Sequence, residues 1–336
     1  MEVMQLSSLY HDMLSGNSEW FYSGINDFTV EKLDCQNICF GELKKLLQNR
    51  KKDDFRLYRN FFNKHNPKLE FRAQHILSCY SLGKIFYDKS NKIRKAIDDF
   101  VDNNGLNPNS DVQTFRYIWM LICLFHDLGY VYESKMVKAQ DNFIEKKLQD
   151  MPERALGIPY IYTQKLLLSY HKYRKCRFGV EDHGLSGGAI LFKDLSKHFN
   201  GRTDEWREKL HSCVSWVIAC HNIFYSSDIN DKCYVCKSLN DLCKEKSPRN
   251  ITLADHPLLF LFCLIDSIEP LKVFGSTKDL ESIDLDFSEE NITVKINMPC
   301  GGQKIDFFNR IRSLNNWLTD VTYIESTECI CVSIKL

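Results

Sequence analysis

The sequence has no excess charge of either sign, because 44 lysines and arginines balance 44 aspartates and glutamates among 336 residues. A balanced chain has no overall field that attracts nucleic acid or an anionic membrane. Long apolar runs are also missing: the longest, 117–125 and 257–265, are well short of the ~18–20 residues that a membrane span needs. We therefore expect no membrane span and no nucleic-acid surface.

The first residues, MEVMQLSSLYHDML, lack the basic flank and apolar stretch of a secretory signal. The chain has 14 cysteines, but Cys79, Cys123, Cys220 and Cys263 lie inside apolar runs. Cysteines in such a setting are typically small buried thiols rather than disulfide partners. These features predict a cytoplasmic protein in a reducing compartment.

Strand patterns are nearly absent before residue 290, and most of the chain has apolar residues at three- and four-residue spacing. After Pro270, alternation in 292–298 and 329–336 predicts strands, and the spacing in 306–318 predicts a helix. The expected fold is mainly α, a helical bundle with a small C-terminal α/β appendage. The sequence contains no internal repeat. The helices that we expect are 39–64, 70–87, 91–102, 112–128, 134–149, 182–198, 203–224 and 256–268.

Ionisable residues lie within or at the end of the most apolar helices. The run YIWMLICLF leads into His126 and Asp127, VSWVIAC leads into His221, and PLLFLFCLI leads into Asp266. His75 has a similar setting. One such histidine is usually a satisfied core group, but four helices repeat the arrangement. Buried charges are paired, protonated or bound to metal. We predict a divalent transition metal site, since imidazole and carboxylate suit Mn, Fe, Co, Ni or Zn.

The order of these residues resembles the HD superfamily of metal-dependent phosphohydrolases. That family has a histidine, a His-Asp pair, further histidines and a late aspartate. The segment DHGLSGGAIL is also similar to the family helix H-x-x-x-G-x-x-I-L, and Arg72 fits the family opening R-x-x-H. In this chain the series of metal ligands that the resemblance implies is His75, His126, Asp127, His183, His221 and Asp266.

The resemblance implies two metal ions. His75 and Asp266 would complete the shell of one ion, His183 and His221 would bind the other, and Asp127 would bridge the two. The resemblance covers about residues 70–270, which we expect to form an HD-type bundle. Outside that range we expect a helical extension over 1–69 that packs on the core, and the α/β appendage over 285–336.

The activity that the resemblance implies is that of a phosphodiesterase acting on a nucleotide or cyclic nucleotide through a metal-activated hydroxide. His126 and Asp127 would be its catalytic residues. Two residues depart from the cyclic-dinucleotide branch, because Tyr130 replaces a lysine and Asn222 replaces the second histidine of a pair.

The substrate that we expect is a small phosphate ester or nucleotide. Arg72 is one candidate for binding phosphate. The basic stretch 171–177 is another if it forms a lid, and its alternative interpretation is a solvated loop or helix end. Nearby aromatic residues either stack on a base or only pack. The residues of these sets are Lys172, Arg174, Lys175 and Arg177 for phosphate, and Tyr130, Tyr132, Phe178 and Phe224 for the base.

Three alternatives remain at this point. The ligand order also resembles the di-iron oxygenase branch of the same superfold. The other alternative for the whole chain is a non-catalytic nucleotide-binding or interaction protein, with the appendage after residue 285 as its interaction module. In the main interpretation we expect the appendage to support oligomerisation, for example a homo-oligomer, or regulation rather than chemistry. Separately, Cys233, Cys236 and Cys243 form either a plain loop or a zinc site, which needs a fourth ligand such as Cys220 or His256.

Overall fold

The structure is a computed structural model in which part of the chain is described. At some described helical positions, Arg72 and Arg177 among them, only the backbone is described. The predicted helix 39–64, most of the predicted helix 306–318 and the Cys233, Cys236 and Cys243 cluster lie outside the described residues. The described residues are 3–5, 70–106, 114–127, 129–133, 142–160, 162–198, 205–223, 251–269, 282–297, 311, 318–325 and 329–336.

The chain divides into two compact units. The division passes through one helix, between Leu264 and Ile265. The domain boundaries expected from the sequence stay a prediction. Unit 1 consists of residues 1–91, 265–312 and 321–336, and unit 2 consists of residues 92–264 and 313–320.

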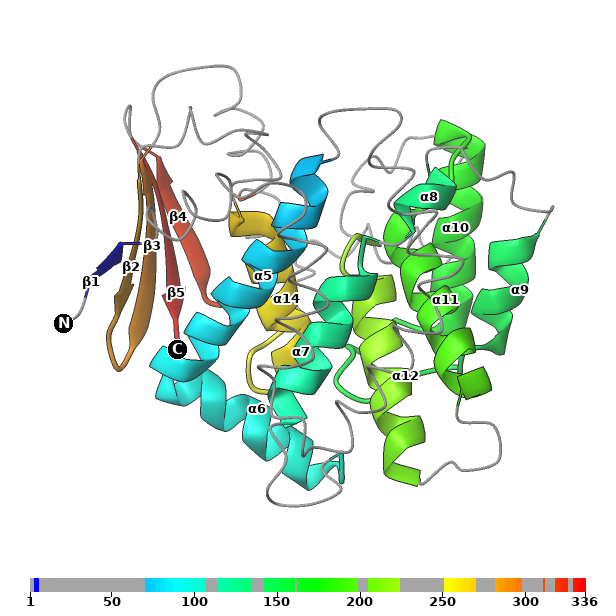
Figure 1. Cartoon of the computed structure of the whole chain (residues 1–336), viewed down its shortest axis with the longest axis horizontal. Helices are drawn as coiled ribbons and strands as arrows, with labels where there is room; N and C mark the ends of the chain where they lie inside the picture. The colour runs from blue at the N-terminus through cyan, green and yellow to red at the C-terminus, as the bar shows by residue number, and fades with distance from the viewer. Residues whose placement is uncertain are drawn as a thin grey trace. The chain divides into compact units, whose positions relative to one another are not determined.

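Unit 1 contains an antiparallel sheet with strand order β1-β2-β3-β5-β4 (Figure 1). Every second residue of β3 and β5 is buried, so their apolar side chains cover one face of the sheet. Cross-strand pairs such as Ile292 with Ile334 and Val294 with Val332 fix the register of this face. The strands are β1 (Val3–Gln5), β2 (Ser282–Phe287), β3 (Asn291–Asn297), β4 (Val321–Glu325) and β5 (Cys329–Lys335).

The two strands predicted from alternation are confirmed as β3 and β5, whereas β1, β2 and β4 were not predicted. β2 was missed because its sequence, SIDLDF, carries two aspartates, which are depleted in strands. Its alternate residues Ile283 and Leu285 are nevertheless buried and lie opposite Ile296 and Val294 of β3. Burial on one face therefore outweighs the poor propensity of the aspartates.

Unit 1 also contains helix α5 (Glu70–Lys89), which confirms the prediction for 70–87. Cys79, Leu82 and Phe86 are buried at three- and four-residue spacing. The Phe86 ring meets Phe287 of β2 edge to face, with 5.6 Å between ring centroids. This contact packs α5 against the sheet.

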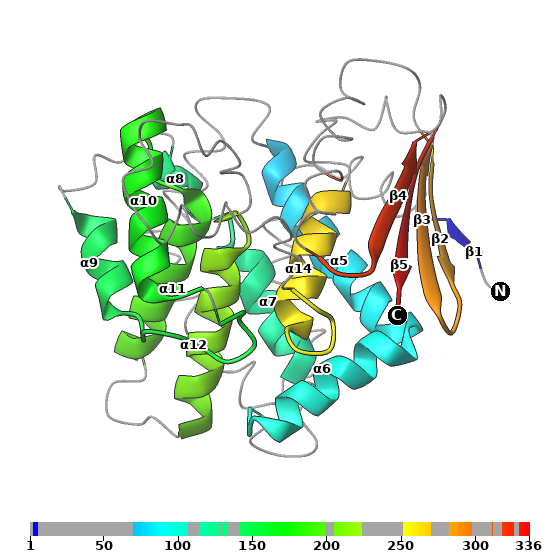
Figure 2. The same ribbon diagram turned by 180° about the vertical axis from the view of Figure 1, so that it is seen from behind.

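Unit 2 is helical, and its central helix is α11. Figures 1 and 2 show α11 between α12 and α9, and α12 also lies against α7. Helix α14 crosses the division between the units. The helices are α6 (Asn91–Asn103), α7 (Thr114–Phe125), α8 (Tyr130–Glu133), α9 (Phe143–Asp150), α10 (Gln164–Phe178), α11 (His183–His198), α12 (Glu205–Cys220) and α14 (Pro257–Ile268).

Most of the expected helices of unit 2 are confirmed, although α8 and α10 were not predicted. The basic stretch 171–177 is the C-terminal half of α10. Its charges hid a buried stripe that includes Leu167 and Tyr170. Two end signals were present in the sequence: the Thr163 hydroxyl accepts a hydrogen bond from the Leu166 N–H, and Gly179 ends the helix with φ of 66°.

The described structure is thus mainly α with a small C-terminal α/β part, as predicted. The expectation of buried cysteine thiols is confirmed for Cys79, Cys123, Cys220 and Cys263. Among the described helices, none combines the length and apolar character that crossing a membrane requires.

The turn before α14 is closed by side chains. The Thr252 backbone N–H donates to His256 Nδ1 at 3.3 Å, and the Thr252 hydroxyl donates to the Asp255 carboxylate at 2.8 Å. Burial lowers the pKa of His256, although the charge of Asp255 opposes that shift.

A lowered folded-state pKa means that the unfolded chain binds more protons, so stability falls as the pH drops through the ordinary histidine range near ~6.5. We expect His256→Gln to reduce the pH dependence of the unfolding free energy between about pH 7 and 5. Urea unfolding curves at several pH values measure this, and an unchanged slope would contradict the assignment.

Candidate metal centre

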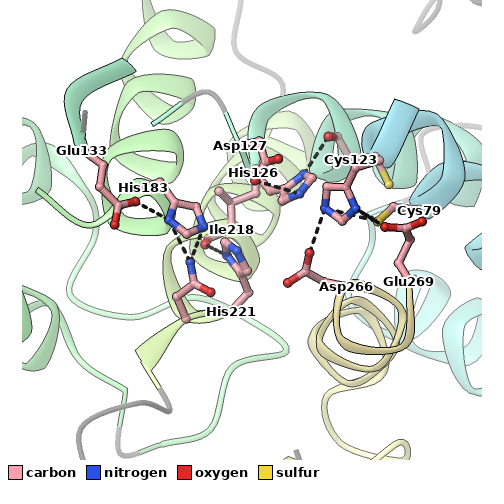
Figure 3. A network of polar contacts seen from close by, with 12 residues as sticks. Cys79, Cys123, His126, Asp127, Glu133, His183, Ile218, His221, Asp266 and Glu269 are labelled. Atoms are coloured by element: carbon pink, nitrogen blue, oxygen red, sulfur yellow. Dashed lines mark hydrogen bonds and ion pairs between the residues drawn. The ribbon is translucent and has the colours of Figure 1, made fainter. Parts of the chain in front are cut away.

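His126 and Asp127 follow directly after α7, and both are completely buried. The His126 Nδ1–H donates to the Cys123 carbonyl oxygen at 2.8 Å (Figure 3). A carbonyl can only accept, so the proton of a neutral ring is at Nδ1 and a lone pair is at Nε2. That Nε2 lies 3.2 Å from Asp127 Oδ1. Two lone pairs at this distance repel unless a proton or a metal ion lies between them.

The distance between these two donor atoms fits a metal ion. Ligand atoms about 2.1 Å from one ion, at angles between octahedral and tetrahedral, lie roughly 3.0–3.4 Å apart. Imidazole nitrogen and carboxylate oxygen together suit the first-row transition metals. The pair His126 and Asp127 therefore has the chemistry and the spacing of a metal-binding pair.

Two further predicted ligands, His183 and His221, lie in the same unit. His183 begins α11, and His221 follows the last residue of α12. The His221 ring centroid is 5.4 Å from that of His183 and 5.7 Å from that of His126. Three helices far apart in the sequence thus bring three buried imidazoles together, as predicted.

The rings of His183 and His221 are held by the same nitrogen as that of His126. The His183 Nδ1–H donates to Glu133 Oε2 at 2.7 Å, and the His221 Nδ1–H donates to the Ile218 carbonyl at 2.6 Å (Figure 3). The Asn222 amide also contacts His183 Nε2, in agreement with a lone pair there. Metal-binding histidines commonly give their other ring proton to a carboxylate or carbonyl, which fixes the tautomer.

Aromatic side chains surround these rings. Phe262 of α14 lies 5.1 Å from both His126 and His221, measured between ring centroids. Tyr130 stacks on His183, with 3.7 Å between centroids and 13° between ring planes. Tyr130 thus packs on a predicted ligand. Apolar walls limit water around the imidazoles and strengthen electrostatic interactions among them.

Two glycines allow the backbone segments of this group to approach closely. A Cβ atom on Gly187 would lie 2.6 Å from the Phe125 carbonyl oxygen, and one on Gly129 would lie 1.9 Å from the His183 carbonyl oxygen. Real Cβ atoms do not approach backbone this closely, so both positions require glycine. The start of α11 can therefore lie directly against the end of α7.

Arg174, a predicted phosphate-binding residue, connects two carboxylates beside His183. Its guanidinium lies 2.8 Å from Glu133 and 3.6 Å from Asp182. Burial raises the pKa of the Asp182 carboxyl, and the charge of Arg174 opposes that shift. Arg174 thus holds Glu133, which in turn holds the His183 ring.

The other predicted phosphate-binding residues have different settings. Lys172 lies 3.4 Å from Glu145 and Lys175 lies 2.8 Å from Glu181, and both lysines are exposed. Arg72 is on α5, where its side chain is not described. Phosphate binding by these residues stays a prediction.

Unit 1 contains a second group, built on His75 of α5 and Asp266 of α14. His75 is fully buried between two carboxylates, with Nδ1 2.6 Å from Glu269 Oε2 and Nε2 3.1 Å from Asp266 Oδ1. A neutral imidazole has one proton and can donate to only one of them. The second contact again requires a proton or a metal ion, and its 3.1 Å separation fits a metal. Cys79 lies near the same ring, with Sγ 3.7 Å from Nε2 (Figure 3).

The structure therefore brings the predicted ligands together in two groups, one in each unit. That the two groups share one centre stays a prediction. Sequence reasoning missed three residues that support the rings. Glu133 binds the His183 ring, Glu269 binds the His75 ring, and Ser78 donates to Glu269. Glu269 carried a usable signal, because it follows Asp266 by three residues and so belongs to the same helical face.

Comparison of the chain with protein-family models, with curated proteins and with solved structures finds no match. Membership of the HD superfamily, and an HD-type arrangement of the bundle, therefore stay predictions. Function is inferred from the two groups of side chains described above.

Proposed function

We propose that the chain is a metal-dependent phosphohydrolase of the HD type, which hydrolyses a phosphodiester bond of a nucleotide or cyclic nucleotide. One observation supports the metal most directly. In each unit a buried histidine, His126 or His75, donates a hydrogen bond from its Nδ1–H to a fixed acceptor. Its Nε2 then points at an aspartate oxygen 3.1–3.2 Å away. Such a pair is stable with a cation between its two atoms.

Two ions, drawn from Mn, Fe, Co, Ni and Zn, match this donor set. A divalent ion at such a site lowers the pKa of water and neutralises charge on phosphoryl oxygens. The residues that would hold the ions are His126, Asp127, His183 and His221 in unit 2, and His75 and Asp266 in unit 1.

The side chains around the ligands prepare the site before substrate binds. Glu133 and the backbone carbonyls keep the imidazoles in the tautomer that presents Nε2. Phe262 and Tyr130 cover the rings and limit competing water. Because these positions are fixed in advance, little reorganisation is needed when charge develops on the substrate. His126 and Asp127 are the residues that we place closest to the reaction.

A phosphate ester also needs cations at its outer oxygens. Lys172 and Lys175 are suited to that role, because both lysine side chains are exposed to solvent. Arg174 is more buried and holds Glu133, so we assign it to the support of His183 instead. Arg72 remains a proposed phosphate contact on the strength of its R-x-x-H position alone.

The test is metal analysis of the full-length chain purified without oxygen, followed by hydrolysis assays. We expect about two transition-metal ions per chain and release of product from bis(p-nitrophenyl) phosphate or a cyclic nucleotide. Chelation should abolish turnover, and added Mn²⁺ or Fe²⁺ should restore it. An ion present at 100 times its dissociation constant should also stabilise the fold by about 2.7 kcal/mol.

Chelator-treated protein provides the control for both measurements. Absence of bound metal together with no activity on any phosphate ester would contradict the proposal. Oxygen-dependent turnover without phosphate chemistry would instead favour a di-iron oxygenase.

A further inference from the structure

Glu269 is a fully buried carboxylate immediately after α14. Its backbone N–H still donates to the Ile265 carbonyl at 3.0 Å, so the helical turn continues through it. Both side-chain oxygens are bound by residues of α5: Oε2 by His75 Nδ1 at 2.6 Å, and Oε1 by the Ser78 hydroxyl at 2.7 Å. Within unit 1 this carboxylate therefore connects α5 with the end of α14.

Burying a charged carboxylate is costly unless hydrogen bonds compensate it, and both oxygens of Glu269 are compensated in this way. Ser78 follows His75 by three residues, so both donors lie on one face of α5. With Oε1 held by Ser78, Oε2 has a defined position, and the imidazole plane of His75 is defined in turn. Nε2 then points at Asp266 Oδ1.

We propose that Glu269 is a positioning residue, which together with Ser78 orients His75 and sets the affinity of unit 1 for its metal ion. This inference rests on the proposed function, because it takes His75 and Asp266 as metal ligands. A carboxylate on the far nitrogen also makes an imidazole a stronger base and hence a stronger ligand.

The histidines of unit 2 differ in how they are held. His126 and His221 donate to backbone carbonyls, which no substitution of a side chain removes. Glu133, which holds His183, is partly exposed and shares its carboxylate with Arg174. Of the two carboxylates that hold predicted ligands, Glu269 is fully buried and Glu133 is not. Substitution of Glu269 should therefore have the larger effect on metal binding.

The experiment uses the full-length chain with Glu269→Leu, Glu269→Gln and Ser78→Ala. Affinity for Co²⁺ and Zn²⁺ is measured by competition with a chelating dye, and the cobalt protein is examined by visible absorption. We expect Glu269→Leu to weaken the binding of one ion by about 10–100-fold. Glu269→Gln should lose less, because its amide oxygen still accepts the Nδ1 proton. Ser78→Ala should lose least.

Glu181→Gln is the matched control, because Glu181 is also a buried carboxylate bound to a histidine, His171, that is outside the predicted ligand set. It should leave the affinities and the cobalt spectrum unchanged. The cobalt bands should shift only in the Glu269 and Ser78 variants, since they report on the geometry and basicity of the ligands.

The outcomes separate the two proposals. If the wild-type chain binds metal but all three variants keep its affinity and spectrum, the role of Glu269 is overturned and the proposed function stands. Lower thermal stability with unchanged affinity and spectrum would show a purely structural carboxylate, with the same consequence. A wild-type chain that binds no metal overturns both proposals. Should Glu269→Leu fail to fold, Glu269→Gln and Ser78→Ala still decide.

Discussion

Replacement of Asp127 by asparagine is expected to lower phosphodiester hydrolysis by more than about 100-fold, which is the upper range for changes in residues that only support a metal ligand. Asparagine has the same shape but no negative charge, so the fold should be kept while the ion loses its anionic partner. The measurements are metal content and initial rates for the wild type and the variant, each with added Mn²⁺.

The same substitution should also change the stability of the chain, and the direction of that change should depend on whether metal is bound. Without metal, Asp127→Asn removes a completely buried carboxylate, so the variant should be at least as stable as the wild type. With metal, the wild type should become the more stable protein, because only it gains the binding free energy. Urea unfolding in chelator and in saturating Zn²⁺ separates the two cases.

Asp150→Asn is a suitable control for this comparison. Asp150 is exposed and forms a surface ion pair with Lys193, so its substitution should change stability little in either condition. If Asp127→Asn destabilised the chain equally with and without metal, Asp127 would have a packing role and not the proposed ligand role.

Replacement of Gly129 by alanine is expected to be among the most destabilising single changes in unit 2. The added Cβ would lie 1.9 Å from the His183 carbonyl oxygen, and backbone cannot give way as the end of a flexible side chain can. The loss of unfolding free energy should reach or exceed the upper end of the ~1–3 kcal/mol that overpacking costs. Metal affinity should fall as well, because His183 must move away from the end of α7.

Gly105→Ala is the matched control for that prediction. Gly105 has φ of 62° but no atom within 4 Å of its Cβ position, so alanine there meets only the left-handed backbone penalty of about 1–2 kcal/mol. It should leave metal binding unchanged. Calorimetry of both variants checks the difference, and a smaller loss in Gly129→Ala than in Gly105→Ala would contradict the close approach of these two segments.

The sequence predicted the elements that carry their own local signal. Helices α7 and α14 are apolar runs long enough to fold as buried helices, α12 has an apolar second half, and β3 and β5 alternate strictly. The sequence-based prediction failed where charged residues interrupt the apolar pattern of an element. Helix α10 was missed because lysines and arginines interrupt its buried stripe, and β2 was missed because aspartates occupy its other face.

For the candidate site, the sequence alone indicated which residues are candidate metal ligands, by their type and local position. An ionisable residue at the end of an apolar run is a property of neighbouring residues, so His126, Asp127, His221 and Asp266 could be found without a fold. How each ring is held, and which nitrogen it presents, depends on the tertiary structure. Glu133 is 50 positions from His183, and Glu269 is 194 positions from His75. Hydrogen bonds across such separations leave no local pattern, because they form only when packed helices bring the two side chains together.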